Sequence, residues 1–119
     1  MVPPSELPPG LLAEYLDSMR AQLGLLAGLA DRLATAAGDR DALTALQRET
    51  HKIHGSAGSY GFWDASRLAA GMEETAKAWA AHADDRDVDR GSLTHRFVAQ
   101  LAHMLGLAVP HAPVNRRGL

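Results

Sequence analysis

The chain has 119 residues, 46% of them hydrophobic and 22% charged, which is typical of one globular domain with a single core. Its formal net charge of -2 does not favour binding to nucleic acid or to an anionic membrane surface. The absence of cysteine excludes disulfides and cysteine-ligated metals. No apolar run approaches the roughly 20 residues that span a bilayer, and the N-terminus lacks a signal-peptide pattern. We therefore expect a cytoplasmic, monomeric protein without a membrane segment, whose partner is another protein or a small ligand.

Alanine and leucine dominate the sequence, and few segments are rich in valine, isoleucine or threonine, so we expect an all-α fold. Prolines at positions 3, 4, 8 and 9 predict an extended lead-in over residues 1–10. Apolar residues then recur at steps of three and four. This periodicity predicts a long amphipathic helix from Leu11 to Ala37.

A second helix is predicted after Gly38, with Asp39 or Asp41 as its N-cap. Its apolar residues alternate at steps of three and four as far as Tyr60, and Gly61 interrupts the pattern. We expect this helix to end near Gly61.

A third helix follows and is predicted to end near His82, because its apolar residues keep the same spacing up to that point. Residues 83–91 are highly charged and have no apolar periodicity, which indicates a solvated loop. Ser92 is the expected N-cap of a fourth helix, and Gly106 is its expected end.

Short connections between four amphipathic helices predict an antiparallel up-and-down four-helix bundle over residues 11–107, followed by a flexible tail over residues 108–119. Trp63 and Trp79 are expected to be core or semi-buried, and Phe62 is expected to pack where the second and third helices meet. Four further histidines are expected to face solvent or to be partly packed: His82, His95, His103 and His111.

The second predicted helix carries His-Lys-Ile-His-Gly-Ser-Ala over residues 51–57, an imidazole followed one turn later by a glycine. Glycine inside a helix costs roughly 1 kcal/mol relative to alanine. Gly55 is therefore interpreted as keeping the surface beside His51 bare, and Gly58 is expected to lie near the same patch. On a helical wheel at about 100° per residue, His51 lies away from the apolar stripe, so we expect its side chain to be exposed.

Arg48 and His54 flank His51 at a distance of three residues, which places cationic or ionisable groups beside the exposed imidazole. This arrangement suits a reaction in which a bulky partner brings a phosphoryl group in line with an imidazole nitrogen. A side chain at position 55 would obstruct that approach.

Residues 51–57 resemble the motif His-x-Leu-Lys-Gly-Ser-Ala of histidine-containing phosphotransfer (HPt) domains, and residues 58–62 and 68–73 are also similar to that family. The resemblance implies a four-helix bundle in which His51 accepts a phosphoryl group from a receiver-domain aspartate and returns it to another. Arg48 and His54 would then stabilise the phosphate, while Gly55 and Gly58 would permit close approach. The usual lysine is replaced by His54, which is only partly charged near neutral pH.

The same resemblance implies a phosphorelay carrier rather than an autonomous enzyme. The expected partners are a response-regulator receiver domain and a hybrid histidine kinase. No cofactor is expected on this chain, and Mg²⁺ is expected on the receiver.

Two alternatives from other classes remain open. One is a helical interaction module that binds a receiver without carrying phosphate. The other is the dimerisation and phosphoacceptor domain of a histidine kinase, which is disfavoured because Lys52 and Ser56 stand where that class has an acidic residue and a proline.

A metal site is not predicted. His51 and His54 could supply two ligands, but the second helix offers no third histidine and no carboxylate is expected beside them. Glu73 and Glu74 are interpreted as a solvated or locally paired face of the third helix.

Overall fold

The computed structural model describes residues 3–85 and 88–110. Within these ranges the chain forms a 3-10 turn and four α-helices: η1 (Pro4–Glu6), α1 (Pro9–Thr35), α2 (Arg40–Ser59), α3 (Trp63–Ala81) and α4 (Arg90–Leu105). Residues 111–119, which include His111 and most of the predicted tail, lie outside the described residues.

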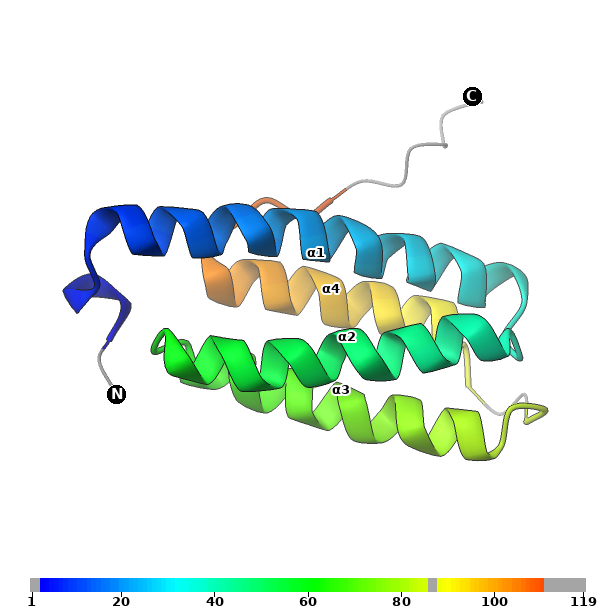
Figure 1. The fold of residues 1–119 in the computed structure, drawn as a ribbon. Coiled ribbons are helices and arrows are strands. Elements are labelled where there is room, and N and C mark those ends of the chain that lie inside the picture. The colour runs from blue at the N-terminus through cyan, green and yellow to red at the C-terminus, as the bar shows by residue number, and fades with distance from the viewer. Residues whose placement is uncertain (1–2, 86–87, 111–119) are drawn as a thin grey trace, which may run out of the picture.

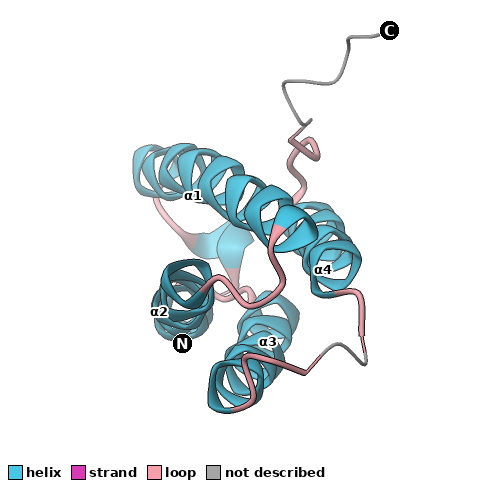
Figure 2. Cartoon of the chain, turned by 90° about the vertical axis from the view of Figure 1, so that its right-hand side faces the viewer, coloured by secondary structure: helices cyan, strands magenta, loops and turns pink. Residues whose placement is uncertain are grey.

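The four helices pack as an antiparallel up-and-down bundle (Figure 1), in which α1 and α3 run in one direction and α2 and α4 in the other. Each helix contacts two others, so that α1 and α3 both lie against α2 and α4. In the view of Figure 2, α1 and α4 lie on one side of the bundle and α2 and α3 on the other. The predicted all-α fold is confirmed. Among the described residues, no helix combines the length and apolar character that crossing a membrane requires.

The core consists of the apolar stripes predicted from the sequence, turned inward from all four helices. Each leucine-sized side chain buried there contributes about 1.5–3 kcal/mol of transfer free energy. The largest side chains that are almost fully buried are mainly aliphatic: Met19, Leu23, Leu26, Leu33, Leu43, Leu46, Ile53, Val98 and Leu101.

Helix boundaries follow local chemistry, and some differ from the prediction. The lead-in contains the turn η1 instead of being wholly extended, and α1 begins at Pro9, because proline is well suited to the first position of a helix. This helix ends at Thr35 rather than Ala37. Asp39 caps α2 by accepting a hydrogen bond from the Ala42 N–H at 3.0 Å, as one of the two predicted caps.

The start of α4 differs most from the prediction. Asp89, not Ser92, is the N-cap, and it accepts hydrogen bonds from the Ser92 N–H at 3.0 Å and the Ser92 hydroxyl at 2.8 Å. A carboxylate at this position satisfies an exposed helix N–H, so the helix begins at Arg90, inside the segment predicted as a loop.

Arg90 is buried, with 2% of its surface exposed. Its Nη1 donates to the carbonyls of Ala37 at 2.7 Å and Ala83 at 3.1 Å, and its Nη2 donates to the carbonyl of His82 at 2.8 Å. The guanidinium also lies 5.6 Å from the centre of the Trp79 ring. Through these hydrogen bonds, the Arg90 side chain at the start of α4 links the α1–α2 connection to the residues that follow α3.

Glycines with positive φ end two helices as the sequence predicts. Gly61 has φ of 85° just after α2, and Gly106 has φ of 70° at the C-cap of α4. The prediction for Trp79 is confirmed because this ring is buried, whereas the prediction for Trp63 is wrong because 46% of its surface is exposed at the first position of α3.

The contact between α1 and α4 depends on Gly91. A Cβ atom at this position would lie 2.6 Å from both Cα and Cβ of Ala34. We expect Gly91→Ala to lower the free energy of unfolding by about 1–3 kcal/mol, because the α1 backbone must move to admit the methyl group. Urea unfolding measures this change.

The matched control for Gly91→Ala is Gly24→Ala. Gly24 is exposed within α1, and an added Cβ would have no neighbour within 4 Å. This control should raise stability by up to about 1 kcal/mol through helix propensity. A Gly91→Ala protein as stable as the wild type would contradict the tight contact.

Candidate functional site

His51 lies on the outer face of α2, with 71% of its side chain exposed. Its helix buries Leu46, Thr50 and Ile53 against the rest of the bundle. The imidazole therefore extends away from the core, and the predicted exposure of His51 is confirmed.

A carboxylate from the neighbouring helix bridges the two histidines of the motif. Glu73, on α3, has Oε2 at 2.8 Å from Nδ1 of His51 and Oε1 at 3.4 Å from Nδ1 of His54. The two imidazole rings stand 6.5 Å apart, centre to centre, and are nearly perpendicular. We call these three residues the His51–His54–Glu73 cluster.

The contact with Glu73 determines which nitrogen of His51 is available for chemistry. An ionised carboxylate only accepts hydrogen bonds, so Nδ1 of His51 carries the proton and donates the hydrogen bond to Glu73. In the neutral ring, Nε2 then keeps its lone pair. The exposed imidazole thus presents a nucleophilic nitrogen while its other nitrogen is held in place.

Glu73 is well suited to accept this hydrogen bond. Only 14% of its side chain is exposed. Burial raises the pKa of this carboxyl, but the hydrogen bonds from His51 and His54, with the positive charge those rings can carry, outweigh burial and lower it. The side chain therefore stays ionised at neutral pH and acts as a fixed acceptor beside the imidazoles.

The antiparallel pairing of α2 and α3 puts Glu73 opposite His51. Residues 51 and 73 lie equally far along the chain from Phe62, at the turn between the two helices. Closer to that turn, a Cβ on Gly58 would lie 3.4 Å from the hydroxyl oxygen of Ser66, which donates to the carbonyl of His54 at 2.7 Å. Gly58 thus lies against α3, although the sequence predicts that it permits the close approach of a partner.

Gly55 does have the open surroundings that the sequence predicts. It is exposed, and a Cβ added there would meet no atom within 4 Å. The surface one turn beyond His51 therefore has open space at position 55.

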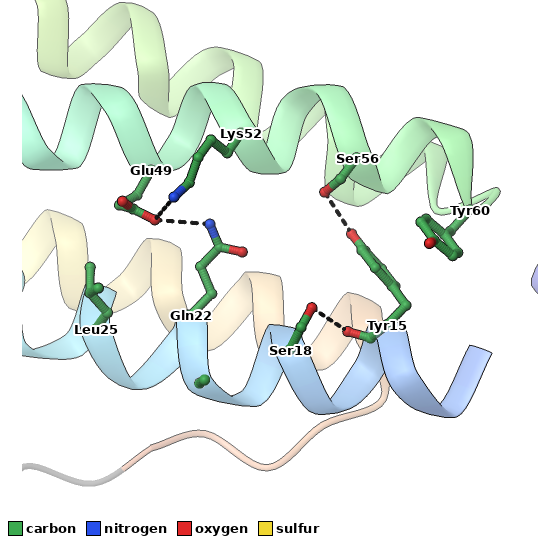
Figure 3. A pocket seen from close by; sticks show the side chains of 9 residues that line it. Tyr15, Ser18, Gln22, Leu25, Glu49, Lys52, Ser56 and Tyr60 are labelled. Atoms are coloured by element: carbon green, nitrogen blue, oxygen red, sulfur yellow. Dashed lines mark hydrogen bonds and ion pairs between the residues drawn. The ribbon is translucent and has the colours of Figure 1, made fainter. Parts of the chain in front are cut away.

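Arg48 and Lys52, the basic residues that flank the motif on α2, pair with a second glutamate. Glu49 has Oε2 at 3.5 Å from Nε of Arg48 and Oε1 at 3.1 Å from Nζ of Lys52. Gln22 of α1 also donates to Oε1 of Glu49, at 3.0 Å (Figure 3). Burial raises the pKa of Glu49, but the hydrogen bonds from Lys52, Gln22 and Arg48 outweigh it and the pKa is lowered. Arg48 is thus paired with Glu49 and is not part of the cluster.

The groove between α1 and α2 in Figure 3 lies on the α1 side of the motif. Lys52 points into this groove toward α1, whereas the cluster lies against α3. At the other end of the groove, the hydroxyls of Tyr15 and Ser56 are 3.1 Å apart, and the ring of Tyr15 stacks on Tyr60 with centres 4.0 Å apart. These contacts fix the packing of α1 against the helix that carries His51.

Sequence reasoning missed Glu73. Its interpretation as a solvated or locally paired surface residue is wrong, because its carboxylate reaches across to another helix and is mostly buried. The statement that no carboxylate accompanies the two histidines is wrong for the same reason. The predicted helical hairpin is the signal that could have identified Glu73. Residues equally distant from a short turn lie at the same level in two antiparallel helices.

The fold and the site together define an antiparallel four-helix bundle with an exposed, carboxylate-supported histidine on its second helix. Residues 10–108 match the family model described as the Hpt domain. Comparison with curated proteins gives no match, and comparison with solved structures gives none. Because the matched region covers most of the sequence, the chain belongs to the Hpt domain family.

The lowered pKa of Glu73 provides a test of the cluster. Carboxyl-carbon NMR should find its pKa below the ordinary value of about 4.3 for glutamate, and His51→Gln together with His54→Gln should raise it by removing the two imidazole partners. The pKa of Glu73 is lower in the folded state than in the unfolded state, so the ionised carboxylate stabilises the fold at pH values above its ordinary pKa. This stabilisation is lost as the pH falls through the lowered pKa.

His103→Gln, on the exposed face of α4, is the control for this titration and should leave the pKa of Glu73 unchanged. An unchanged pKa in the double variant would show that the imidazoles do not stabilise the ionised carboxylate.

Proposed function

We propose that this protein carries a phosphoryl group on Nε2 of His51 between receiver-domain aspartates in a two-component phosphorelay. Membership of the Hpt family supports histidine phosphotransfer as the general activity. The observation that carries the assignment to His51 is its exposed ring with Nδ1 held by Glu73, one turn from the bare surface at Gly55.

In the proposed transfer, the lone pair of Nε2 attacks the phosphorus of an aspartyl phosphate. The N–P bond forms as the P–O bond to the aspartate breaks, and the electron pair of that bond leaves with the carboxylate. The imidazole gains positive charge, which Glu73 stabilises through its hydrogen bond to Nδ1. Transfer to the next aspartate reverses these steps.

The bundle contributes position rather than acid–base chemistry. A fixed Nδ1 contact holds the ring so that a docked receiver meets Nε2 in line. Mg²⁺ on the receiver would neutralise the phosphoryl oxygens. Arg48 and protonated His54, one turn on either side of His51, are the proposed cationic neighbours of the phosphoryl group.

The partners in this proposal are a receiver domain and a hybrid histidine kinase, and family membership supports such partners in general terms. The cytoplasmic location and the monomeric state stay predictions. Membership of the Hpt family gives no support to the histidine-kinase dimerisation domain.

His51→Gln tests the proposed acceptor. Incubation with a phosphorylated receiver should label the wild-type chain with an acid-labile, base-stable phosphoryl group, and His51→Gln should reduce this label to background. Thermal unfolding should change little, because the side chain is mostly exposed. His103→Gln is the matched control and should be labelled like the wild type. Normal labelling of His51→Gln would refute the assignment.

Gly55→Leu tests the requirement for a bare surface. A leucine at this exposed position should slow transfer from a phosphorylated receiver at least tenfold, because it occupies the space through which the partner approaches. Acceptance from a small donor such as phosphoramidate should fall much less. Gly28→Leu, at an exposed glycine of α1 with equally open surroundings, should leave both rates unchanged. Equal receiver rates for Gly55→Leu and Gly28→Leu would exclude an access role.

A further inference from the structure

We propose that His51, His54 and Glu73 form a binding site for Zn²⁺ and similar divalent transition metals. We further infer that the bound metal prevents phosphoryl acceptance, and this second part rests on the proposed function of His51.

The spacing of the three side chains fits one small cation. One ligand atom from each residue can be chosen so that all three lie within 4.8 Å of one another. The Nδ1 atoms of His51 and His54 lie 2.8 and 3.4 Å from the two oxygens of Glu73. Tetrahedral zinc with bonds of about 2.0–2.2 Å needs ligand atoms roughly 3.4 Å apart. The contact between His54 and Glu73 already has this spacing, and a small rotation of the exposed His51 ring widens its 2.8 Å contact to the same value.

The donor types select the class of metal. Two imidazoles and one carboxylate suit zinc, copper and nickel, whereas Mg²⁺ prefers oxygen ligands and retains several waters. Three protein ligands leave a fourth tetrahedral position open to water or to an added ligand. In the part of the chain that the structure describes, no other group of three histidine, aspartate or glutamate side chains has such spacing.

The position of the ligands explains why the metal opposes phosphorylation. A metal on Nδ1 of His51 uses the lone pair of that nitrogen, so the single proton of the neutral ring resides on Nε2. Nε2 then has no lone pair with which to attack phosphorus. The metal also takes the carboxylate of Glu73, which otherwise fixes the proton on Nδ1.

The first experiment measures metal binding alone. Titration calorimetry of the full chain with Zn²⁺ in excess Mg²⁺ should show one equivalent bound. His51→Gln, His54→Gln and Glu73→Gln should each weaken the affinity at least tenfold, with thermal unfolding measured to check that each variant is folded. His103→Gln and Glu74→Gln, at exposed positions outside the cluster, are the matched controls and should change it less than twofold.

Two results would overturn the metal site. Equal affinities for Glu73→Gln and Glu74→Gln would remove the carboxylate ligand, and an equal loss in His103→Gln would indicate scattered surface binding. Loss of zinc binding in excess Mg²⁺ would also contradict the predicted selectivity.

The second experiment measures acceptance from phosphoramidate, whose P–N bond breaks to release ammonia as the bond to Nε2 forms. Zn²⁺ at a concentration that saturates the wild type but not His54→Gln should slow wild-type acceptance at least tenfold. It should change the rate of His54→Gln less than twofold, because that variant lacks a metal ligand. An unchanged wild-type rate with zinc bound would overturn the exclusion. If the protein binds zinc but accepts no phosphoryl group with or without Zn²⁺, the proposed function is refuted and the metal site is still supported.

Discussion

The close contact between α2 and α3 is the constraint on which the site depends. Gly58 of α2 lies against Ser66 of α3 in this contact, where an added Cβ would be 3.4 Å from the serine hydroxyl oxygen. Larger residues there would separate the two helices and withdraw Glu73 from the imidazoles. The same close approach lets the Ser66 hydroxyl reach a carbonyl of α2 at 2.7 Å. The packing of α2 against α3 therefore determines whether Glu73 reaches His51 on the surface.

Two glutamates divide the polar face of α2 into parts with different chemistry. Glu49 is largely buried and pairs with Arg48 and Lys52, whereas Glu73 comes from α3 and pairs with His51 and His54. Each carboxylate is held ionised by its partners, so the permanent cations and the titratable rings have separate counter-charges. The exposed imidazole is consequently oriented by an anion, while the nearby guanidinium has a different partner.

The periodicity of apolar residues predicts the helices well, because burial of one stripe decides where a helix lies and which side chains are exposed. The exposure of His51 and the open surface at Gly55 follow from this periodicity alone. The N-cap at Asp89 and the partners of Glu73 could not be found in that way. Aspartate and serine are about equally good N-caps, so the periodic pattern does not choose between Asp89 and Ser92. Glu73 contacts a neighbouring helix, which the periodicity of its own helix does not reveal.

All three members of the cluster come from one helical hairpin with a short turn. Many binding and catalytic sites need segments that are distant in sequence, and closing those long loops costs entropy and slows folding. Here the chain needs only the pairing of consecutive helices to bring the imidazoles and the carboxylate together. Assembly of the site thus depends on a local pairing of helices, and α1 and α4 pack against that hairpin.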